Sequence, residues 1–419
     1  LSNLLNINLI FLILSSSLIL RNLITGGAGF LGSHIVDYLM NKGEEVICLD
    51  NFSTGSKENI SHWIGNNRFK LLNQNIVKPF FCEADRIWHL ACPASPLNYL
   101  NNPIQTLNTI FLGTENILKL TKKINARILI ASTSEIYGNP EISPQKETYN
   151  GSVNPISKRS CYVEGKRVAE TLCFEFKRIH NIDLRLVRIF NTYGPRMMKN
   201  DGRVVSNFIY QGLNNKPLSI YGNGLQTRSF CYVDDMIEGL FRTMNSNYSY
   251  PINLGNPEEI TIKNLAHKIS LNLNRKPNLQ YLKMPEDDPI QRKPCIETAI
   301  KELKWKPKIC LNKGLVKTID YFFERLKNEI YDAKIARLAV LTSRKTGAPM
   351  DKDLFETGLE KRKATLGADY VQKSLDGADD FSRPFQEAMT AWCWGFGWGD
   401  EAIDAKTRSM MNLSMIGAL

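Results

Sequence analysis

The stretch NLITGGAGFLGSHIV, residues 22–36, decides the fold, because a short apolar run leads into a glycine turn that opens a helical pattern. Gly26, Gly29 and Gly32 have the spacing of a dinucleotide-binding fingerprint, and they stand in the strand–turn–helix context that such a fingerprint requires. The first two glycines permit a tight turn and a close approach of the backbone to a ligand, and Gly32 lets the helix pack on the sheet. The pattern therefore predicts that a pyrophosphate binds at the positive N-terminus of this helix.

Groups around this turn would complete a cofactor site. We expect the main chain of Phe30 and Leu31, at the start of the helix, to face the phosphates. Asp50 ends the next predicted strand, where a carboxylate can accept hydrogen bonds from both hydroxyls of an adenosine ribose. The same charge would repel a 2′-phosphate, so the sequence predicts NAD rather than NADP.

Tyr162 and Lys166 lie four residues apart in a helical pattern, so their side chains leave the same face of one helix. The ammonium group can stabilise a phenolate, which makes the tyrosine a usable base near neutral pH. A lone Tyr-x-x-x-Lys pair arises often by chance. Downstream of a dinucleotide fingerprint, the pair indicates proton transfer beside a bound cofactor.

From residue 22 onward, short apolar runs alternate with helical periodicity, which predicts βαβ units and a doubly wound parallel α/β sheet of the Rossmann type. Beyond Pro195 the pattern becomes irregular, which indicates a smaller α/β lobe for the substrate, mainly residues 195–330. The predicted strands are residues 22–25, 45–50, 86–90, 127–132 and 184–190, and the predicted helices are residues 30–42, 103–124 and 162–180.

The composition is that of an ordinary globular protein of 419 residues, long enough for more than one domain. The net charge of +11 is spread along the chain without a long basic block, so we expect no nucleic-acid partner. The nine cysteines are scattered and never spaced C-x-x-C, which argues against a disulfide framework and against a metal site. These features favour a reducing, cytoplasmic location.

Residues 4–20 carry no charge and have the length of a membrane anchor. Asn6, Asn8 and the three serines at 15–17 interrupt the run, and no basic region precedes it. We therefore treat residues 1–21 as an apolar N-terminal segment and disfavour a membrane span. The chain begins with Leu rather than Met, so we expect an incomplete or processed end.

Several further stretches of the sequence make the predicted class of enzyme more specific. They are DNFSTGSKENI (50–60), STSEIYG (132–138), NPISKRSCYVEGKRVAE (154–170), RIFNTYGPRM (188–197), DGRVVSNFI (201–209), YGNGLQTRSF (221–230) and DDPIQRKP (287–294). Together with the glycine turn and the Tyr–Lys pair, they resemble the UDP-glucuronic acid decarboxylase (UDP-xylose synthase) family of the extended short-chain dehydrogenase/reductase superfamily. The resemblance covers residues 22–330, and it implies a UDP-sugar substrate, NAD and a homodimer.

The resemblance implies a reaction in which NAD is used and regenerated. Oxidation of C4 of UDP-glucuronate creates a β-keto acid, which loses carbon dioxide to give an enolate, and re-reduction of C4 then yields UDP-xylose. The Tyr–Lys pair would remove the proton of the C4 hydroxyl, and Thr133 would bind the C4 oxygen. Ser134 and Glu135 would serve the decarboxylation and the reprotonation of C5. Arg292 would receive the substrate carboxylate as a bidentate partner.

The same resemblance assigns residues to the two nucleotides. The positions implied for the UDP moiety are Asn191, Arg203, Asn207, Tyr221 and Arg228. For the adenosine of NAD we expect Asn51, next to Asp50, and Asn75, which stands where the family usually has Asp. An amide at that position can still meet the adenine edge, so we expect weaker rather than absent binding.

Three alternatives share some of these features. A nucleotide-sugar 4,6-dehydratase typically has an Asp-Glu pair after the Ser-Thr, whereas this chain has Ser134-Glu135. A 4-epimerase needs neither that glutamate nor an arginine for a substrate carboxylate. A non-catalytic NAD-binding scaffold would need none of Tyr162, Lys166 and Arg292.

The composition changes after residue 330, because asparagine is frequent up to Asn328 and then occurs only at Asn412. We interpret residues 331–349 as a linker and residues 350–419 as a helical domain of different origin. The stretches MDKDLFETGLEKRKATLGADYV (350–371) and FSRPFQEAMTAWCWGFGW (381–398) resemble part of the carboxymuconolactone decarboxylase family, whose small all-helical subunits oligomerise. We expect a partial domain without activity of its own.

Overall fold

The protein is described here by a computed structural model that covers residues 19–199, 202–284, 291–345, 352–378, 383–391 and 394. The chain divides into two compact units, residues 1–323 and 324–419. The larger unit carries the glycine turn and the other residues predicted for a site.

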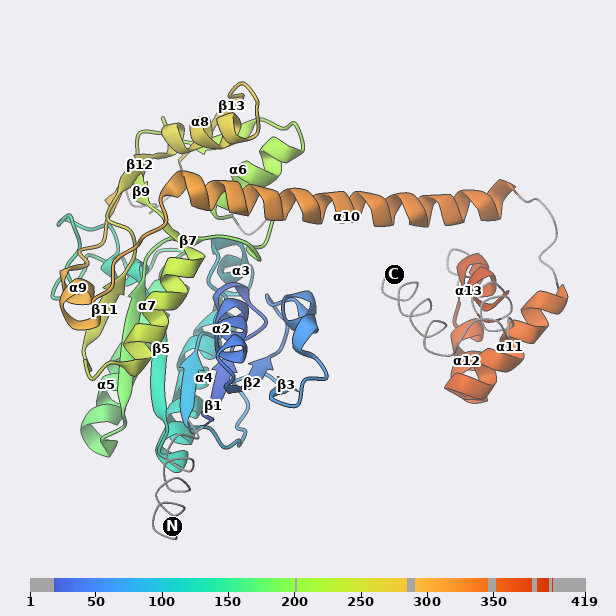
Figure 1. Ribbon diagram of the computed structural model, residues 1–419, viewed down its shortest axis with the longest axis horizontal. Coiled ribbons are helices and arrows are strands. Elements are labelled where there is room, and N and C mark those ends of the chain that lie inside the picture. The colour runs from blue at the N-terminus through green and yellow to red at the C-terminus, as the bar shows by residue number, and fades with distance from the viewer. Residues whose placement is uncertain are drawn as a thin grey trace, which may run out of the picture. The chain divides into compact units, whose positions relative to one another are not determined.

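The larger unit is built around a seven-stranded parallel sheet (Figure 1). Its strands are β1 (Arg21–Thr25), β2 (Glu45–Asp50), β3 (Phe69–Asn73), β4 (Arg86–His89), β5 (Arg127–Thr133), β6 (Leu184–Ile189) and β11 (Pro251–Leu254). The order across the sheet is β11-β6-β5-β4-β1-β2-β3, so the direction of winding reverses beside β1. This doubly wound arrangement confirms the fold class predicted from the sequence.

Helices cover both faces of this sheet (Figure 1). One face carries α2 (Phe30–Asn41) and α7 (Val233–Asn245), and the other carries α4 (Pro103–Ile124) and α5 (Ser160–His180). Successive residues of β1 point into the two layers: Leu23 packs in the core on the α4 side, and Ile24 packs in the core on the α2 side. Both faces of β1 are therefore buried, as is typical of a strand inside a parallel sheet.

Local signals in the sequence place the ends of the two longest sheet-covering helices. At the start of α4, the side chain of Asn102 accepts a hydrogen bond from the Gln105 N–H at 3.2 Å, and Pro103 occupies the first turn. Asn125 and Asn181 end α4 and α5 in the left-handed conformation, both with φ of 52°. The predicted helix 103–124 is confirmed at both ends, and the predicted helix 162–180 begins two residues earlier.

The lobe beyond Pro195 is more regular than the sequence indicated, so the expectation of irregular elements is corrected. Its short strands form small sheets of order β12-β9-β14, β13-β8 and β10-β7. Strands of two to four residues are too short to show a period of two, which is why the pattern was missed. The elements are β7 (Thr192–Tyr193), α6 (Val204–Leu213), β8 (Leu218–Tyr221), β9 (Thr227–Ser229), β10 (Cys231–Tyr232), β12 (Glu259–Thr261), α8 (Ile262–Asn272), β13 (Leu279–Leu282), β14 (Gln291–Arg292) and α9 (Glu297–Leu303).

Part of the range expected for the lobe belongs to the central sheet instead. Strand β11 pairs in parallel with β6, and α7 packs on the same face as α2. The chain thus leaves the sheet after β6, contributes to the lobe, and returns for α7 and β11. The predicted domain boundaries themselves stay a prediction.

The C-terminal part is helical wherever it is described. Helix α10 (Leu311–Lys345) includes residues 331–345, which the composition assigned to a linker. The elements α11 (Lys352–Leu366), α12 (Ala368–Asp376) and α13 (Arg383–Met389) follow. Within the smaller unit, the buried Arg362 donates to Thr390 Oγ1 and to Gln386 Oε1, both at 2.8 Å. Much of the segment 381–398 and all of 401–419 lie outside the described residues.

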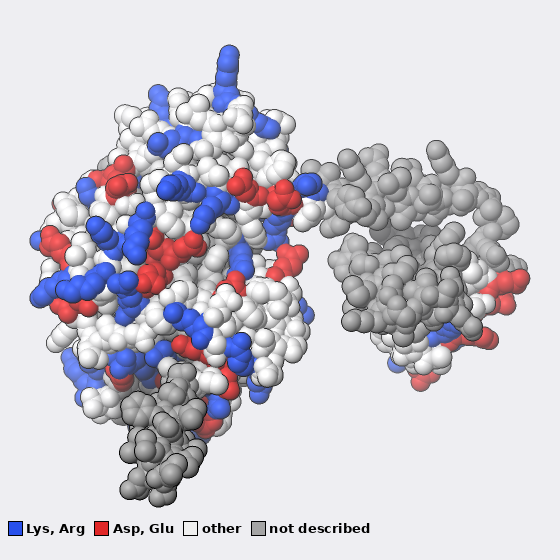
Figure 2. All heavy atoms as spheres, in the orientation of Figure 1, with Lys and Arg blue, Asp and Glu red and all other residues white. Residues whose placement is uncertain are grey.

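Over the described part of the face drawn in Figure 2, basic and acidic side chains are interspersed. In the part of the chain that the structure describes, no helix combines the length and the apolar character needed to cross a membrane. Most of the predicted apolar segment, residues 1–18, lies outside the described residues.

Asp235 joins the sheet-covering helix α7 to the segment before α10, and this contact can be tested. Its buried Oδ2 accepts hydrogen bonds from the N–H groups of Lys308, at 2.9 Å, and Ile309, at 2.8 Å. We expect Asp235→Ala to lower the free energy of unfolding by about 2–4 kcal/mol, because two backbone donors lose their acceptor. The measurement is urea denaturation followed by circular dichroism.

The matched control is the neighbouring Asp234, which is half exposed and forms a 3.4 Å ion pair with Lys317. Asp234→Asn should change the free energy of unfolding by less than about 1 kcal/mol, because exposed ion pairs contribute little. Equal losses in the two variants would contradict a special role for the Asp235 contact.

Candidate active site

The predicted site residues gather along the carboxyl edge of the parallel sheet. The glycine turn follows β1, Asp50 ends β2, Asn75 follows β3, Thr133 ends β5 and Asn191 follows β6. In doubly wound sheets this edge, where the strand order reverses, is the place where ligands bind.

The glycine turn has the geometry that a phosphate group requires. Gly26 has φ of 71°, and a Cβ on it would lie 2.9 Å from the main chain of Ala91. A Cβ on Gly32 would lie only 2.0 Å from the carbonyl oxygen of Gly26, so the helix could not approach the turn this closely with any other residue. No side chain caps the N-terminus of α2, and no acidic residue stands in its first turn. The residues present therefore fit a dinucleotide pyrophosphate.

Asp50 lies beside this turn and is almost fully buried. Its Oδ2 accepts a hydrogen bond from the Ala28 N–H at 2.9 Å, and its Oδ1 accepts one from the Phe52 N–H at 2.8 Å. Burial raises the pKa of this carboxyl group, and the backbone N–H groups partly oppose that shift. The carboxylate is thus held at the end of β2 in a position that fits the ribose contact predicted for it.

The two asparagines expected near the adenosine are both engaged in local turns. Asn51 is exposed, and its Oδ1 accepts from the Ser53 N–H at 3.1 Å. Asn75 is half-buried, and its Oδ1 accepts from the Val77 N–H at 3.0 Å. An adenine contact by Asn75 would then fall to its Nδ2 donor, and both assignments stay predictions.

Tyr162 and Lys166 occupy successive turns of α5 next to the end of β5. Tyr162 is 5% exposed, and Lys166 Nζ donates to the carbonyl oxygen of Ala131 at 2.7 Å. Burial raises the pKa of Tyr162 well above its ordinary range; nearby Cys92 and Glu135 add to this, whereas a hydrogen bond with the Thr133 side chain opposes it. Tyr162 is therefore a neutral phenol here, and the effect expected of Lys166 on its pKa stays a prediction.

Glu135 lies between guanidinium groups from three different parts of the chain. Its Oε2 is 2.9 Å from Arg159 NH2 and its Oε1 is 3.7 Å from Arg292 NH1. Arg228 faces the same place, because it is the register partner of Arg292 on neighbouring strands β9 and β14. Burial alone would raise the pKa of Glu135, but the charges of Arg159, Arg292 and Arg228 lower it below its ordinary value.

Thr133 and Ser134 join this cluster through the end of β5. Thr133 Oγ1 accepts the Glu135 N–H at 3.2 Å and caps the short 3₁₀ helix η2 (Ser134–Tyr137). Ser134 is buried at 2% exposure. The structure therefore brings together all six residues predicted for catalysis: Tyr162, Lys166, Thr133, Ser134, Glu135 and Arg292.

The residues predicted for UDP are spread over the lobe. Arg203 stands immediately before α6, and its guanidinium carbon lies 5.3 Å over the ring of Phe30. Asn207 lies on α6, and Tyr221 is 44% exposed at the end of β8. Asn191 follows β6, where its carbonyl oxygen accepts the Cys231 N–H at 2.9 Å. The assignment of these five residues to UDP stays a prediction.

Two residues of the site were missed by the sequence interpretation. Arg159 precedes Tyr162 by three residues in the quoted stretch 154–170, and helical spacing could have drawn attention to it. Tyr99, on α3 (Pro96–Asn101), is fully buried and stacks on Tyr162 with ring centroids 4.9 Å apart and planes at 3°. Its partner lies 63 positions away in the sequence, so no local pattern could have revealed the stack.

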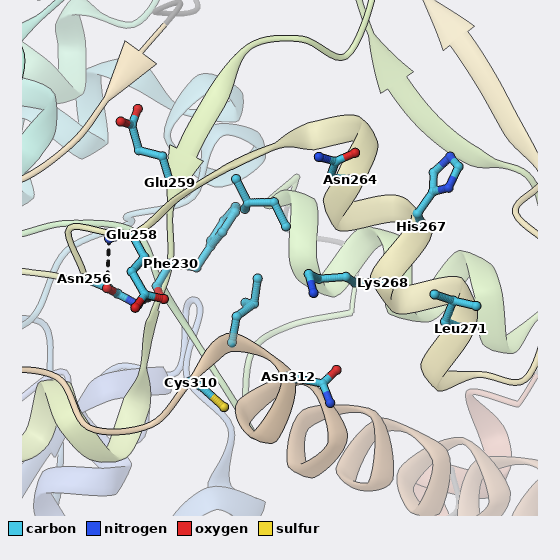
Figure 3. Close-up of a pocket in the computed structure, with 12 residues that line it drawn as sticks. Phe230, Asn256, Glu258, Glu259, Asn264, His267, Lys268, Leu271, Cys310 and Asn312 are labelled. Carbon is cyan, nitrogen blue, oxygen red and sulfur yellow. Dashed lines mark hydrogen bonds between the residues drawn. The ribbon is translucent and has the colours of Figure 1, made fainter.

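A separate hollow of about 520 Å³ lies in the lobe between β12, α8 and the start of α10 (Figure 3). His267 and Lys268 of α8 and Asn312 of α10 line it together with apolar side chains. None of the residues predicted for a site lines this hollow.

Comparison with known proteins places the chain in a family. Residues 22–255 match the NAD dependent epimerase/dehydratase family. UDP-glucuronic acid decarboxylase 1 of Danio rerio is 53% identical over 309 residues, which cover 74% of this chain and 74% of that protein. The chain belongs to the UDP-glucuronic acid decarboxylase family. UDP-glucuronic acid decarboxylase 3 of Arabidopsis thaliana is 54% identical over 297 residues, or 71% of this chain and 87% of that protein.

Solved structures with the same fold are more distant in sequence. The UDP-glucuronic acid 4-epimerase of Bacillus cereus, in complex with UDP-glucuronic acid and NAD, has a TM-score of 0.66 at 26% identity and covers 73% of this chain and 99% of its own. The UDP-glucose 4-epimerase of Thermotoga maritima, with UDP-glucose, has a TM-score of 0.67 at 27% identity with the same coverage. The higher identity groups the chain with the decarboxylases rather than with these epimerases.

The lowered pKa of Glu135 predicts how stability depends on pH. A carboxyl group whose pKa is lower in the folded state stabilises the fold above its unfolded pKa of about 4.3, and this contribution is lost as the pH falls through the folded pKa. As the pH falls from about 5 to about 3, the free energy of unfolding should therefore fall more for the wild type than for Glu135→Gln. Urea denaturation across this range measures the difference.

The matched control is Glu258→Gln, since Glu258 is exposed. This variant should follow the wild-type dependence on pH. If Glu135→Gln lost stability in parallel with the wild type on acidification, the charge cluster would not lower the pKa of Glu135.

Proposed function

We propose that this chain converts UDP-glucuronate to UDP-xylose and carbon dioxide with NAD as an internally recycled cofactor. The observation that carries the proposal is the charge cluster beside the Tyr–Lys pair, in which Arg292 and Glu135 stand at 3.7 Å. An arginine at the sugar end of the site suits a hexuronate carboxylate, because a guanidinium binds a carboxylate through two parallel hydrogen bonds. Membership of the decarboxylase family supports the same reaction.

The guanidinium groups of the cluster suit this substrate. Arg159, Arg228 and Arg292 all face Glu135, and guanidinium groups are suited to binding carboxylates and phosphates. UDP-glucuronate carries a diphosphate at one end and a carboxylate at the other. We assign Arg292 to the carboxylate and Arg228, on the adjacent strand, to the nucleotide side.

Proton removal from the C4 hydroxyl falls to Tyr162. The phenol is buried and neutral, so it needs positive charge nearby before it can accept a proton at neutral pH. We assign this charge to Lys166, which lies one helical turn along α5. NAD⁺, when bound, accepts the hydride from C4 and returns it after carbon dioxide has left.

Loss of carbon dioxide follows from the ketone at C4. The bond between C5 and the carboxyl carbon breaks with its electron pair delocalised into an enolate, whose oxygen Thr133 is placed to bind. Glu135 stays ionised because its pKa is lowered, so it repels the substrate carboxylate that Arg292 holds. The carboxylate leaves as neutral carbon dioxide, so its repulsion by Glu135 ends. Proton delivery to C5 then restores the sugar carbon before C4 is reduced.

The alternatives have weaker support. A 4,6-dehydratase would need an acid where this chain has Ser134. A 4-epimerase has the same fold, and one relative of that class is complexed with UDP-glucuronic acid, but its identity is 26% against 53% for a decarboxylase. A scaffold without catalysis would not require Tyr162 to be buried beside Lys166 and Glu135.

The decisive experiment is mass spectrometry of UDP-glucuronate incubated with the purified protein and NAD⁺. We expect UDP-xylose together with carbon dioxide. Release of a UDP-4-keto-pentose would mean that the reduced cofactor escapes before the hydride returns. Formation of UDP-galacturonate, with no change in mass, would assign the chain to the epimerases, and no turnover would support the scaffold.

Tyr162→Phe tests the assigned base in the same assay. The variant keeps the ring that stacks on Tyr99 and removes the proton acceptor, so turnover should fall by about 10²–10⁴-fold. Tyr250→Phe, at a tyrosine that is 63% exposed, is the control and should retain wild-type turnover. Wild-type activity in Tyr162→Phe would exclude this residue as the base.

We also propose a homodimer formed through α4 and α5, as the family resemblance implies. Support comes from apolar side chains that stay exposed on α4, among them Ile104, Leu107 and Phe111, and from Val168 on α5. Ile104, Leu107 and Phe111 recur at helical spacing along one face. Pairing this face with that of a second copy would form a four-helix bundle. The free thiols of the described cysteines support a reducing location, which we propose to be cytoplasmic.

The dimer is tested by the double variant Leu107→Glu, Phe111→Glu. Burial of two carboxylates in an apolar interface is unfavourable, so light scattering should give the mass of one chain, 47.7 kDa, in place of twice that mass. Ile64→Glu changes another exposed apolar residue, 58% exposed, away from these helices, and should leave the dimer intact. A wild-type protein of monomer mass would contradict the proposal.

A further inference from the structure

Arg292 ends a strand of only two residues, β14, which pairs with β9. Successive side chains of a strand point to opposite faces. Gln291 and Lys293 therefore share one face of this segment. Arg292 points from the other face, where it lies 3.7 Å from Glu135. The direction of its guanidinium then depends on what holds the two neighbours of Arg292.

The carboxylate of Glu259 on β12 contacts both of these neighbours. Its Oε1 accepts a hydrogen bond from Gln291 Nε2 at 2.7 Å, and its Oε2 lies 3.1 Å from Lys293 Nζ. The same Oε1 accepts the hydroxyl of Thr227, on the middle strand β9, at 2.8 Å. Glu259 thus holds the small sheet together on the face opposite Arg292.

The charge of Glu259 suits this role. Burial alone would raise the pKa of its carboxyl group, but hydrogen bonds from Gln291, Thr227 and Lys293 and the charge of Lys293 lower it below its ordinary value. The group is therefore ionised at neutral pH and can accept from all three donors. Figure 3 shows the carboxylate of Glu259 turned away from the hollow of the lobe.

Gln145 holds the same segment through the main chain. Gln145 is fully buried, and its Oε1 accepts the Lys293 N–H at 2.8 Å. Its own N–H donates to the carbonyl oxygen of Lys293 at 2.8 Å, and its carbonyl oxygen accepts the Cys295 N–H at 2.9 Å. Three hydrogen bonds therefore fix the backbone immediately after Arg292.

Glu135, which faces Arg292, is tied to the same glutamine. Asn253 Nδ2 donates to the carbonyl oxygen of Gln145 at 3.0 Å, and Asn253 Oδ1 accepts the hydroxyl of Tyr137 at 2.8 Å. Tyr137 ends η2, the short helix that carries Glu135. Gln145 is thus joined both to the segment of Arg292 and to the helix of Glu135.

We propose that Glu259 and Gln145 are positioning residues that aim Arg292 at the substrate carboxylate and so give the site its preference for a hexuronate. A guanidinium binds a carboxylate through two parallel hydrogen bonds only when its plane has the matching orientation. Without its supports, Arg292 would keep its charge and lose this geometry. The inference deepens the proposed function and rests on it for the role of Arg292.

The test compares two ligands that differ only at C6. UDP-glucose carries a hydroxymethyl group where UDP-glucuronate carries a carboxylate. Each is titrated calorimetrically into cofactor-stripped protein saturated with NADH, which cannot accept a hydride, so neither ligand turns over. We expect the wild type to bind UDP-glucuronate more tightly. Glu259→Gln should lose about tenfold or more of this preference, through weaker binding of UDP-glucuronate alone.

Glu258→Gln is the matched control, because it makes the same change of charge at the exposed neighbour. It should keep the wild-type preference. Gln145→Met removes the buried acceptor at similar side-chain volume and should act as Glu259→Gln does. Its own control is Gln280→Met, at an exposed glutamine. If Gln145→Met does not fold, Glu259→Gln still decides.

An unchanged preference in Glu259→Gln would overturn the proposal. Equal losses of affinity for the two ligands would also overturn it, because they would show general loosening of the lobe. A wild type that does not distinguish the two ligands would contradict the role of Arg292 in the proposed function, and this inference with it. The wild-type titration therefore separates a failure of the proposed function from a failure of the positioning role.

Discussion

The close approach of α2 to the end of β1 is the constraint on which the rest of the site depends. It exists because Gly32 has no side chain: a Cβ there would lie 2.0 Å from the carbonyl oxygen of Gly26. The contact aims the uncapped N-terminus of α2 across the carboxyl edge of the sheet, where the other strands deliver their polar residues. Without this approach the positive helix end and the catalytic groups would not share one site.

Burial and charge act in opposite directions on the groups gathered at that edge. Burial raises the pKa of Tyr162, because its hydrogen bond with Thr133 does not compensate for the lost solvation. Glu135 experiences the same loss of solvation but stays ionised, because Arg159 and Arg292 more than compensate. The surroundings thus raise the pKa of Tyr162 and lower that of Glu135, which widens the ordinary difference between a phenol and a carboxyl group. This separation is what an acid–base reaction at neutral pH requires.

The lobe and the sheet are joined through residues that serve both. Pro195, Arg196 and Arg203 contact one face of α2. Arg228 and Arg292 enter the site from adjacent strands of a small sheet in the lobe. A change in the position of the lobe would therefore act on the cofactor turn and on the charge cluster together. Such coupling suits a reaction in which an oxidised intermediate must be retained until it is reduced.

Much of the fold and of the site could be predicted from local pattern. Spacings over one or two helical turns predicted the glycine turn, the Tyr162–Lys166 pair and helix α4. The structure has α4 at the predicted residues. The short strands of the lobe were missed, since two to four residues carry no measurable period. The contact of Arg159 with Glu135 and the stack of Tyr99 on Tyr162 join residues 24 and 63 positions apart. No local pattern reports such contacts.

The sequence by itself determined the fold class, the position of the cofactor turn and the chemical types of the residues at the site. These follow from backbone stereochemistry and from periodic burial, which act over a few neighbouring residues. Only the tertiary structure decided which charges meet. It set three guanidiniums around Glu135, raised the pKa of Tyr162 and placed Arg203 over Phe30, because pKa values and ion pairs depend on distances between residues remote in the chain.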